Sequence, residues 1–152
     1  MAPRNAVTGI SPRESVFLDT WALIALANAD DRWHAAASRI NTQLLLLEVS
    51  YYTTVAVLTE VGDTLYRRGF RAVAIRILED VLASRQLGRV AIDEVDIDTW
   101  SAAFEFYATR PDQDWSLTDC ISFIVMRRQG ITRAFTGDRH FEQAGFVRLL
   151  EA

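Results

Sequence analysis

Short apolar runs alternate with longer helical segments along almost the whole chain, and this alternation restricts the fold more than any other feature. The runs that predict strands lie at 15–18, 51–54, 88–92, 131–136 and 146–150. The segments that predict helices lie at 19–26, 30–43, 55–68, 70–84, 96–108, 116–128 and 138–143, while 44–47 fits either type. Strands that alternate with helices form a parallel sheet with helices on both faces. We therefore predict an α/β fold, a three-layer α/β/α sandwich with a central, mostly parallel sheet of about five strands.

The length of the chain predicts a single domain. A chain of 152 residues can bury one sizeable core but not two comfortable ones. We assign residues 1–14 to an N-terminal tail and residues 15–152 to the domain. The apolar runs fall far short of the roughly 20 residues of a membrane-spanning helix, and the tail lacks the apolar stretch of a signal peptide. We therefore expect a cytoplasmic protein with no membrane partner.

All sixteen basic residues are arginine, and the chain contains no lysine. This excludes a P-loop, which needs a phosphate-binding lysine, and a Schiff-base enzyme, which needs an amine nucleophile. The net charge of −4 argues against a protein that coats nucleic acid by charge alone. A nucleic acid would have to be bound locally, for instance by Arg67, Arg68 and Arg71, although a solvated surface is the more common explanation of such a group.

Four carboxylates are predicted to meet at one edge of the sheet. Asp19 follows the first strand and Asp138 follows the fourth, so both lie at the carboxyl edge, where ligands bind in open α/β sheets. Asp119 lies in the first turn of a buried helix, and Glu60 lies at the border of an apolar helix stripe. Carboxylates without a nearby lysine repel one another, and a divalent cation such as Mg²⁺ removes this conflict. The group therefore predicts a metal site able to hydrolyse phosphodiester bonds.

Helix capping is the alternative explanation for these acids. Asp19 and Asp138 each precede a predicted helix, as an N-cap does, and 116–119 (SLTD) resembles a capping box. Glu60 alone would then be an acid at a solvated helix edge. The two explanations are compatible, because a helix N-terminus that accepts an acid also attracts phosphate.

The four acids, in this order and on these elements, resemble those of the PIN-domain family, and more narrowly of the VapC-type toxins of bacterial toxin–antitoxin pairs. The motifs are 16–20 (VFLDT), 58–65 (LTEVGDTL), 116–120 (SLTDC) and 136–141 (TGDRHF), and the resemblance covers about residues 15 to 150. The sequence departs from the family pattern in two places. Trp21 is bulkier than the residue expected after Asp-Thr, and the N-terminal tail is longer than in most members.

The resemblance implies an endoribonuclease in which Asp19, Glu60, Asp119 and Asp138 bind Mg²⁺ or Mn²⁺. It also implies three hydroxyl groups that support these ligands, on Thr20, Ser116 and Thr136, with Asp114 as a weaker acidic candidate. The implied partners are an RNA substrate, a protein antitoxin that occludes the site, and a second copy of the chain in a homodimer. A non-catalytic PIN-like module that binds RNA or a partner is the alternative.

Arg139 and His140 lie next to Asp138 in the sequence and are candidates for substrate binding. For His140, packing or helix capping is the more common role. The single cysteine, Cys120, excludes an internal disulfide and a multi-cysteine zinc site.

Overall fold

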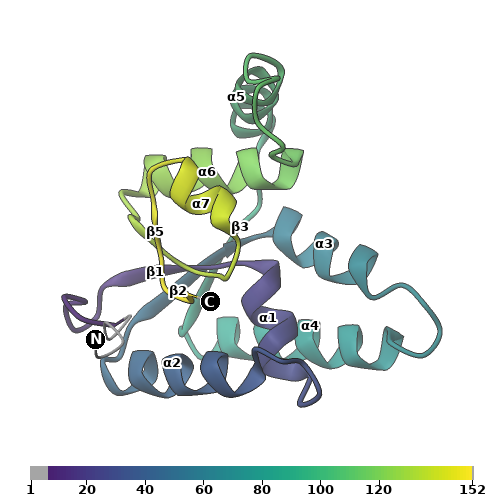
Figure 1. Ribbon diagram of the computed structural model, residues 1–152, viewed down its shortest axis with the longest axis vertical. Coiled ribbons are helices and arrows are strands. Elements are labelled where there is room, and N and C mark those ends of the chain that lie inside the picture. The colour runs from purple at the N-terminus through teal and green to yellow at the C-terminus, as the bar shows by residue number, and fades with distance from the viewer. Residues whose placement is uncertain (1–6, 152) are drawn as a thin grey trace.

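The computed structural model describes residues 7–151 (Figure 1). Residues 1–6 of the predicted tail and residue 152 lie outside the described residues. Five strands form one sheet in the order β3-β2-β1-β4-β5, and all neighbouring strands are parallel. The strands are β1 (Ser15–Leu18), β2 (Ser50–Thr54), β3 (Val90–Asp93), β4 (Arg133–Phe135) and β5 (Val147–Arg148). The predicted fold class is confirmed.

Seven helices connect these strands in the part of the chain that the structure describes. They are α1 (Thr20–Ala27), α2 (His34–Leu46), α3 (Val55–Thr64), α4 (Arg71–Gln86), α5 (Ile97–Ala108), α6 (Leu117–Gln129) and α7 (Arg139–Gln143). In Figure 1, α2 and α4 lie on one side of the sheet and α6 and α7 on the other, with α5 outside α6. None of the described helices is long and apolar enough to cross a membrane.

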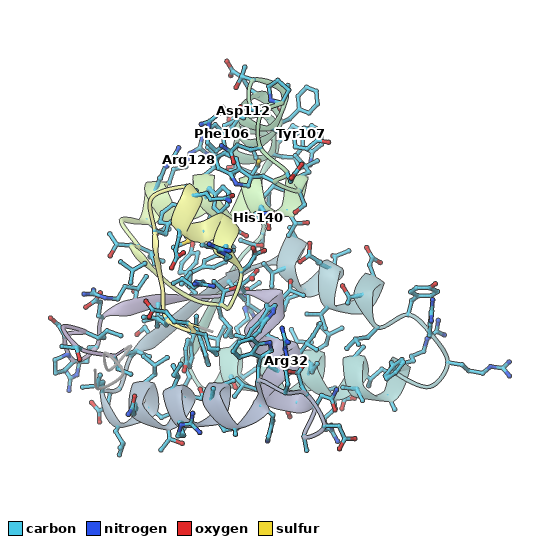
Figure 2. All side chains as sticks on the ribbon, in the orientation of Figure 1. Arg32, Phe106, Tyr107, Asp112, Arg128 and His140 are labelled. Carbon is cyan, nitrogen blue, oxygen red and sulfur yellow. The ribbon has the colours of Figure 1, made fainter. Side chains whose placement is uncertain are left out.

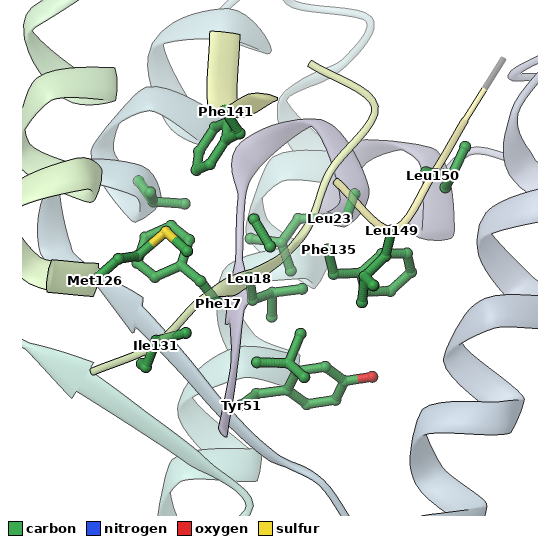
Figure 3. Packing of buried hydrophobic residues seen from close by; sticks show 14 of the residues in the cluster. Phe17, Leu18, Leu23, Tyr51, Met126, Ile131, Phe135, Phe141, Leu149 and Leu150 are labelled. Atoms are coloured by element: carbon green, nitrogen blue, oxygen red, sulfur yellow. The ribbon is translucent and has the colours of Figure 1, made fainter. Parts of the chain in front are cut away.

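The core on the α6 and α7 side is built from aromatic rings. Phe17 of β1, Phe123 of α6 and Phe141 of α7 are fully buried. The rings of Phe123 and Phe141 meet edge to face with their centroids 5.1 Å apart, an arrangement that stabilises the pair beyond simple burial. Figure 3 shows Phe17, Phe141 and Met126 in this layer. The packing holds the first turns of α6 and α7 near the end of β1.

The order of the strands reverses between β1 and β4. The chain moves from β1 to β2 and β3 on one side, and β4 with β5 lies on the other. Leu18 pairs with Phe135 at the ends of the two strands, so both segments leave the sheet side by side. This is the switch point at which open parallel sheets bind ligands, and the following residues include Asp19 and Asp138.

Several element boundaries differ from the predicted ones. Residues 44–46 complete α2, and α2 begins at His34 because Asp31 instead accepts a hydrogen bond from the Trp33 N–H in a turn. Helix α3 ends at Thr64, four residues earlier than predicted, and leaves 66–70 as an exposed connection with no buried apolar residue. Strand β3 covers Val90–Asp93 instead of the predicted 88–92, and β4 and β5 are shorter than the predicted 131–136 and 146–150.

Residues 7–14 lie against the domain. Val7 and Ile10 are buried, and Glu14 forms an ion pair with Arg133 at the start of β4. A guanidinium nitrogen of Arg133 also donates to the carbonyl of Gly9 at 3.1 Å. These residues therefore contribute to the packing beside β4.

Candidate active site

Asp19 is the first residue after β1, and only 5% of its surface is exposed. It occupies the N-cap position of α1, but its carboxylate accepts no capping hydrogen bond. Its Oδ2 instead accepts a hydrogen bond from Oγ1 of Thr136 at 2.7 Å. The capping explanation is therefore wrong for Asp19, and its burial needs another reason.

The turn after β4 links Asp19 to the next acid. Thr136 is fully buried, and its Oγ1 accepts a hydrogen bond from the Asp138 N–H at 3.0 Å. Asp138 Oδ1 accepts a hydrogen bond from the His140 N–H at 2.9 Å and so caps α7. For Asp138 the capping explanation holds, and the capping carboxylate remains only half-buried.

Gly137 and Arg148 fix the path of this turn. A Cβ atom at Gly137 would lie 2.7 Å from the ring of Trp21, so no larger residue fits without displacing the indole. Arg148 Nη1 donates to the Gly137 carbonyl at 2.9 Å, and its Nε pairs with Glu142 at 3.1 Å. Arg148 could not be predicted from the sequence, because nothing in the pattern of β5 distinguishes it from surface arginines.

Asp119 lies in the first turn of α6 and is 7% exposed. It forms a capping box with Ser116: Ser116 Oγ accepts from the Asp119 N–H at 3.0 Å, and Asp119 Oδ2 accepts from the Ser116 N–H at 2.9 Å. The predicted capping box is confirmed. Its two hydrogen bonds fix the direction in which the carboxylate points.

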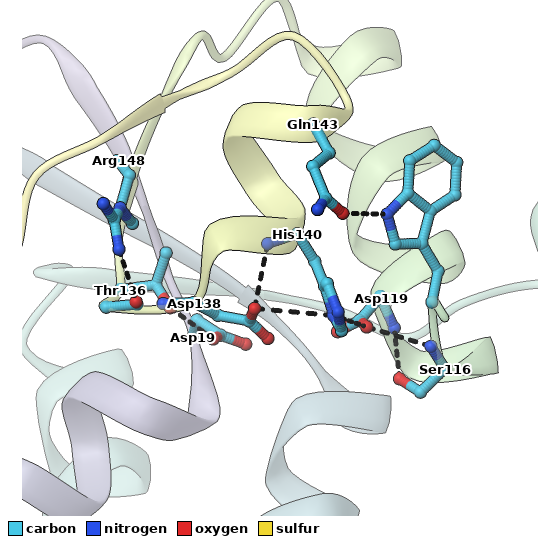
Figure 4. Close-up of polar contacts among 10 residues, drawn as sticks. Asp19, Ser116, Asp119, Thr136, Asp138, His140, Gln143 and Arg148 are labelled. Atoms are coloured by element: carbon cyan, nitrogen blue, oxygen red, sulfur yellow. Dashed lines mark hydrogen bonds and ion pairs between the residues drawn. The ribbon is translucent and has the colours of Figure 1, made fainter. Parts of the chain in front are cut away.

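His140 lies between two of the acids. Its Nδ1 is 3.1 Å from Oδ2 of Asp119 and 3.4 Å from Oδ1 of Asp138 (Figure 4). Ligand atoms of these three residues all lie within 4.8 Å of one another, a spacing that can hold one metal ion. The sequence interpretation, which favoured packing or capping for His140, gave this residue too little weight.

Glu60 completes the acidic group from the opposite side. It is half-buried on α3 and lines a groove of about 550 Å³ together with Thr118 of α6. No hydrogen bond to its side chain occurs among residues 7–151, so the carboxylate is free to face the groove. Its charge is nevertheless close enough to raise the pKa of Asp19.

The electrostatics of the site reflect burial of like charges. Burial raises the pKa of Asp19 from its ordinary value of 3.8 to about 7, against the hydrogen bond from Thr136, which lowers it. The value of about 7 also includes the charges of Asp119, Glu60 and Asp138, which raise the pKa by smaller amounts than burial does. Burial also raises the pKa of Asp119, while the Ser116 N–H lowers it. A bound cation would lower these pKa values, because it favours the ionised carboxylates.

Two predicted supporting residues, Thr20 and Asp114, and the predicted substrate-binding residue Arg139 form no side-chain hydrogen bond with the acids in residues 7–151. Thr20 is buried, but its hydroxyl lies 3.5 Å from the Val57 carbonyl rather than near a carboxylate. Asp114 is exposed, and no hydrogen bond to its side chain occurs in residues 7–151. Arg139 is also exposed and takes part in no ion pair within that range. Thr136 and Ser116, in contrast, each hydrogen-bond one of the acids.

Buried and partly buried carboxylates lie at the switch point of the parallel sheet, where open α/β enzymes bind their ligands, and comparison with known proteins identifies the family. The family model of the PIN domain matches residues 16–147. The chain belongs to the PIN-domain family.

The chain is also similar to individual members of this family. The chain is 33% identical over 135 residues to the 23S rRNA-specific endonuclease VapC20 of Mycobacterium tuberculosis, a match that covers 88% of this chain and 97% of the relative. The same values hold for VapC20 from a second strain, H37Rv.

Solved structures give the same result. The crystal structure of M. tuberculosis VapC20, described as a sarcin-ricin loop cleaving toxin, matches with a TM-score of 0.73 and 31% identity over 87% of this chain and 96% of that one. VapBC2 from Rickettsia felis, bound to a DNA fragment from its promoter, matches with a TM-score of 0.60 over 88% of this chain and 96% of that one. At 13% identity, the second match shows a shared fold alone.

Proposed function

We propose that this protein is an endoribonuclease that depends on Mg²⁺ or Mn²⁺ and acts as the toxin of a toxin–antitoxin pair. The observation that carries the proposal is Asp19, which is buried beside three other acids and caps no helix. A buried carboxylate among like charges destabilises the fold unless a cation joins it. Helix capping explains the positions of Asp119 and Asp138, but it does not explain the burial of Asp19.

The side chains present fit a divalent cation. Asp19, Glu60, Asp119 and Asp138 offer carboxylate oxygens, and His140 offers a ring nitrogen within the same group. Carboxylates suit Mg²⁺ and Mn²⁺, whereas the imidazole favours Mn²⁺ over Mg²⁺. When bound, such an ion supplies a Lewis acid and a water molecule of lowered pKa.

The residues of the chain itself hold this site in shape. Thr136 orients the carboxylate of Asp19, and the Ser116 N–H orients that of Asp119. Glu60 lies at the edge of the groove, which gives an RNA strand access from the side of α3. These hydrogen bonds hold the carboxylates in the orientation that a cation and a phosphate would need.

The nature of the substrate and partners is supported by the relatives. VapC20 is named a 23S rRNA-specific endonuclease, and similarity over 88% of the chain supports RNA as the substrate here. The structure of VapC20 is described as that of a toxin, and the resemblance to VapC-type toxins implies a protein antitoxin as the partner of this chain. We further propose a homodimer that acts in the cytoplasm, where RNA and antitoxin are both present.

Cleavage of RNA by purified protein tests the proposal. The wild type should cleave RNA with Mg²⁺ or Mn²⁺ and stop when EDTA is added, while Asp19→Asn should lose cleavage and remain folded. Asp114→Asn is the matched control, because that acid is exposed and makes no contact with the site. Cleavage that survives in Asp19→Asn would contradict the proposal, and RNA binding without any cleavage by the wild type would support the non-catalytic module instead.

A further inference from the structure

The connection between α3 and α4 concentrates basic and aromatic side chains. Residues 66–71 read YRRGFR, so three arginines and two aromatic rings occur within six residues. Tyr66 is 62% exposed and Phe70 is 51% exposed, and all three arginines are exposed. In Figure 1 this connection lies at the right-hand edge of the molecule, and Figure 2 shows side chains there pointing away from the ribbon.

Backbone hydrogen bonds give the segment a defined shape. The N–H of Phe70 donates to the carbonyl of Arg67 at 2.8 Å, and the N–H of Arg71 donates to the same carbonyl at 3.1 Å. This turn brings Tyr66, Arg67, Arg68 and Arg71 around a surface concavity of about 320 Å³. The side chains are therefore gathered around one hollow rather than spread along a helix.

No acid neutralises the arginines of this segment, as is also true of most other arginines among residues 7–151, but here three of them occur within six residues. Arg110, Arg133 and Arg148 each form an ion pair with an acid. Within residues 7–151, no ion pair involves an arginine of the 66–71 segment. Three uncompensated positive charges on a protein of net charge −4 form a local site for an anion.

The aromatic rings restrict the kind of anion. A solvated surface explains exposed arginines, but it does not explain two aromatic rings beside them. Surfaces that bind single-stranded nucleic acid combine these elements: arginine contacts phosphates, and aromatic rings stack on bases. A duplex would not present base faces to Tyr66 and Phe70, which favours a single strand.

The segment follows directly on the helix that carries Glu60. Helix α3 carries Glu60, and its last residue, Thr64, follows four residues later, about 6 Å along the helix axis. The groove beside Glu60 opens along the same helix. A strand whose phosphate reaches the acids can therefore continue along α3 to the 66–71 connection.

We propose that residues 66–71 bind single-stranded RNA next to the scissile position, with Tyr66 and Phe70 stacking on bases and the three arginines contacting phosphates. This inference rests on the proposed function in that the bound RNA is the substrate of the acidic site. It adds a binding surface outside the four acids and their hydroxyl partners.

Binding measured without cleavage tests it. The host protein is Asp19→Asn in EDTA, and the probe is a fluorescein-labelled single-stranded RNA about 20 nucleotides long, followed by anisotropy at several salt concentrations. Loss of two phosphate contacts in Arg67→Ala/Arg68→Ala should lower the slope of log K against log salt by about 1.4. Tyr66→Ala should weaken binding about fivefold or more through loss of stacking. Arg39→Ala/Arg85→Ala removes the same charge from exposed arginines on α2 and α4 and should leave both quantities unchanged.

The outcomes separate this inference from the proposed function. If the wild type cleaves RNA and the 66–71 variants bind like the control, the inference is wrong and the nuclease proposal stands. If the wild type does not cleave but these variants still lose RNA binding, the nuclease proposal is wrong and the inference stands. If the variants change only self-association in size-exclusion chromatography, with RNA affinity unaltered, the segment is a protein contact and the inference is wrong.

Discussion

Asp19→Asn is expected to stabilise the metal-free protein while removing its activity. The folded-state pKa of Asp19, about 7, lies roughly three units above its ordinary value of 3.8. Each unit corresponds to about 1.4 kcal/mol, so ionising this carboxyl in the folded state costs at most about 4 kcal/mol. The amide of asparagine carries no charge, and its oxygen can still accept the hydrogen bond from Thr136.

The sign of the pH dependence follows from proton uptake. Between about pH 4 and pH 7 the folded wild type holds a proton on Asp19 that the unfolded chain has lost, so wild-type stability falls as pH rises through this range. The stability of Asp19→Asn does not fall in this way, because the asparagine side chain does not ionise. The two proteins should therefore have similar stability near pH 4, and the variant should be more stable at pH 8 by about 2–4 kcal/mol, which is about 5–15 °C in melting temperature.

Thermal melts in EDTA at pH 4, 6 and 8 measure this difference, with Asp114→Asn as an exposed-acid control that should match the wild type at every pH. Adding Mn²⁺ at pH 8 should raise the melting temperature of the wild type and not that of Asp19→Asn, because the ion binds only the complete folded site. A variant that melts at or below the wild type at pH 8 in EDTA would refute the reasoning, because Asp19 would then carry no electrostatic cost.

Three further predictions concern neighbouring residues. His140→Gln should weaken Mn²⁺ binding, measured by calorimetry, more than Mg²⁺ binding, because it removes the one nitrogen ligand; equal losses for both ions would exclude His140 as a ligand. Gly137→Ala should lower the free energy of unfolding by about 1–3 kcal/mol, since its Cβ has no room, whereas Gly62→Ala in the open surface of α3 should raise it by about 0.5–1 kcal/mol. Ser116→Ala should cost about 1 kcal/mol in the free energy of unfolding, because it removes the hydroxyl that accepts the Asp119 N–H. Its Mn²⁺ affinity should stay close to that of the wild type, because the Ser116 N–H that orients the Asp119 carboxylate is kept; a large loss of Mn²⁺ affinity in calorimetry would contradict this.

The sequence predicted the sheet, its parallel arrangement and the edge at which the acids lie. Asp19 and Asp138 follow strands, so their place at the carboxyl edge depends only on strand direction. The end of α3 could not be predicted in this way, because Arg67 and Arg68 are compatible with helix and Gly69 was the only stop signal. The shift of four residues matters, since it places these arginines in the exposed 66–71 connection.

The sequence pattern does not predict contacts between side chains that lie far apart along the chain. Nothing in the sequence indicates that the His140 ring turns back toward Asp119, 21 positions earlier, or that Arg148 reaches the Gly137 carbonyl. Trp21, which departs from the family pattern, packs on Gly137 and against Trp33, whose ring centroid is 5.5 Å away. These contacts depend on the packing of α1 and α7 against the sheet, which local periodicity does not encode.

The acids of this site differ in the contacts that hold them. This difference determines at which acid a substitution separates a role in function from a role in stability. Asp119 and Asp138 accept backbone hydrogen bonds at helix N-termini, so the same carboxylates that would bind a cation also stabilise α6 and α7. Substitution of either acid by alanine removes a cap and a site residue together, and a loss of activity would not separate the two roles. Asp19 stabilises no helix, and its burial opposes its charge. If substitution of Asp19 stabilises the protein while substitution of Asp119 or Asp138 destabilises it, the chain keeps Asp19 at the expense of its own stability. A bound cation explains why such a residue is kept.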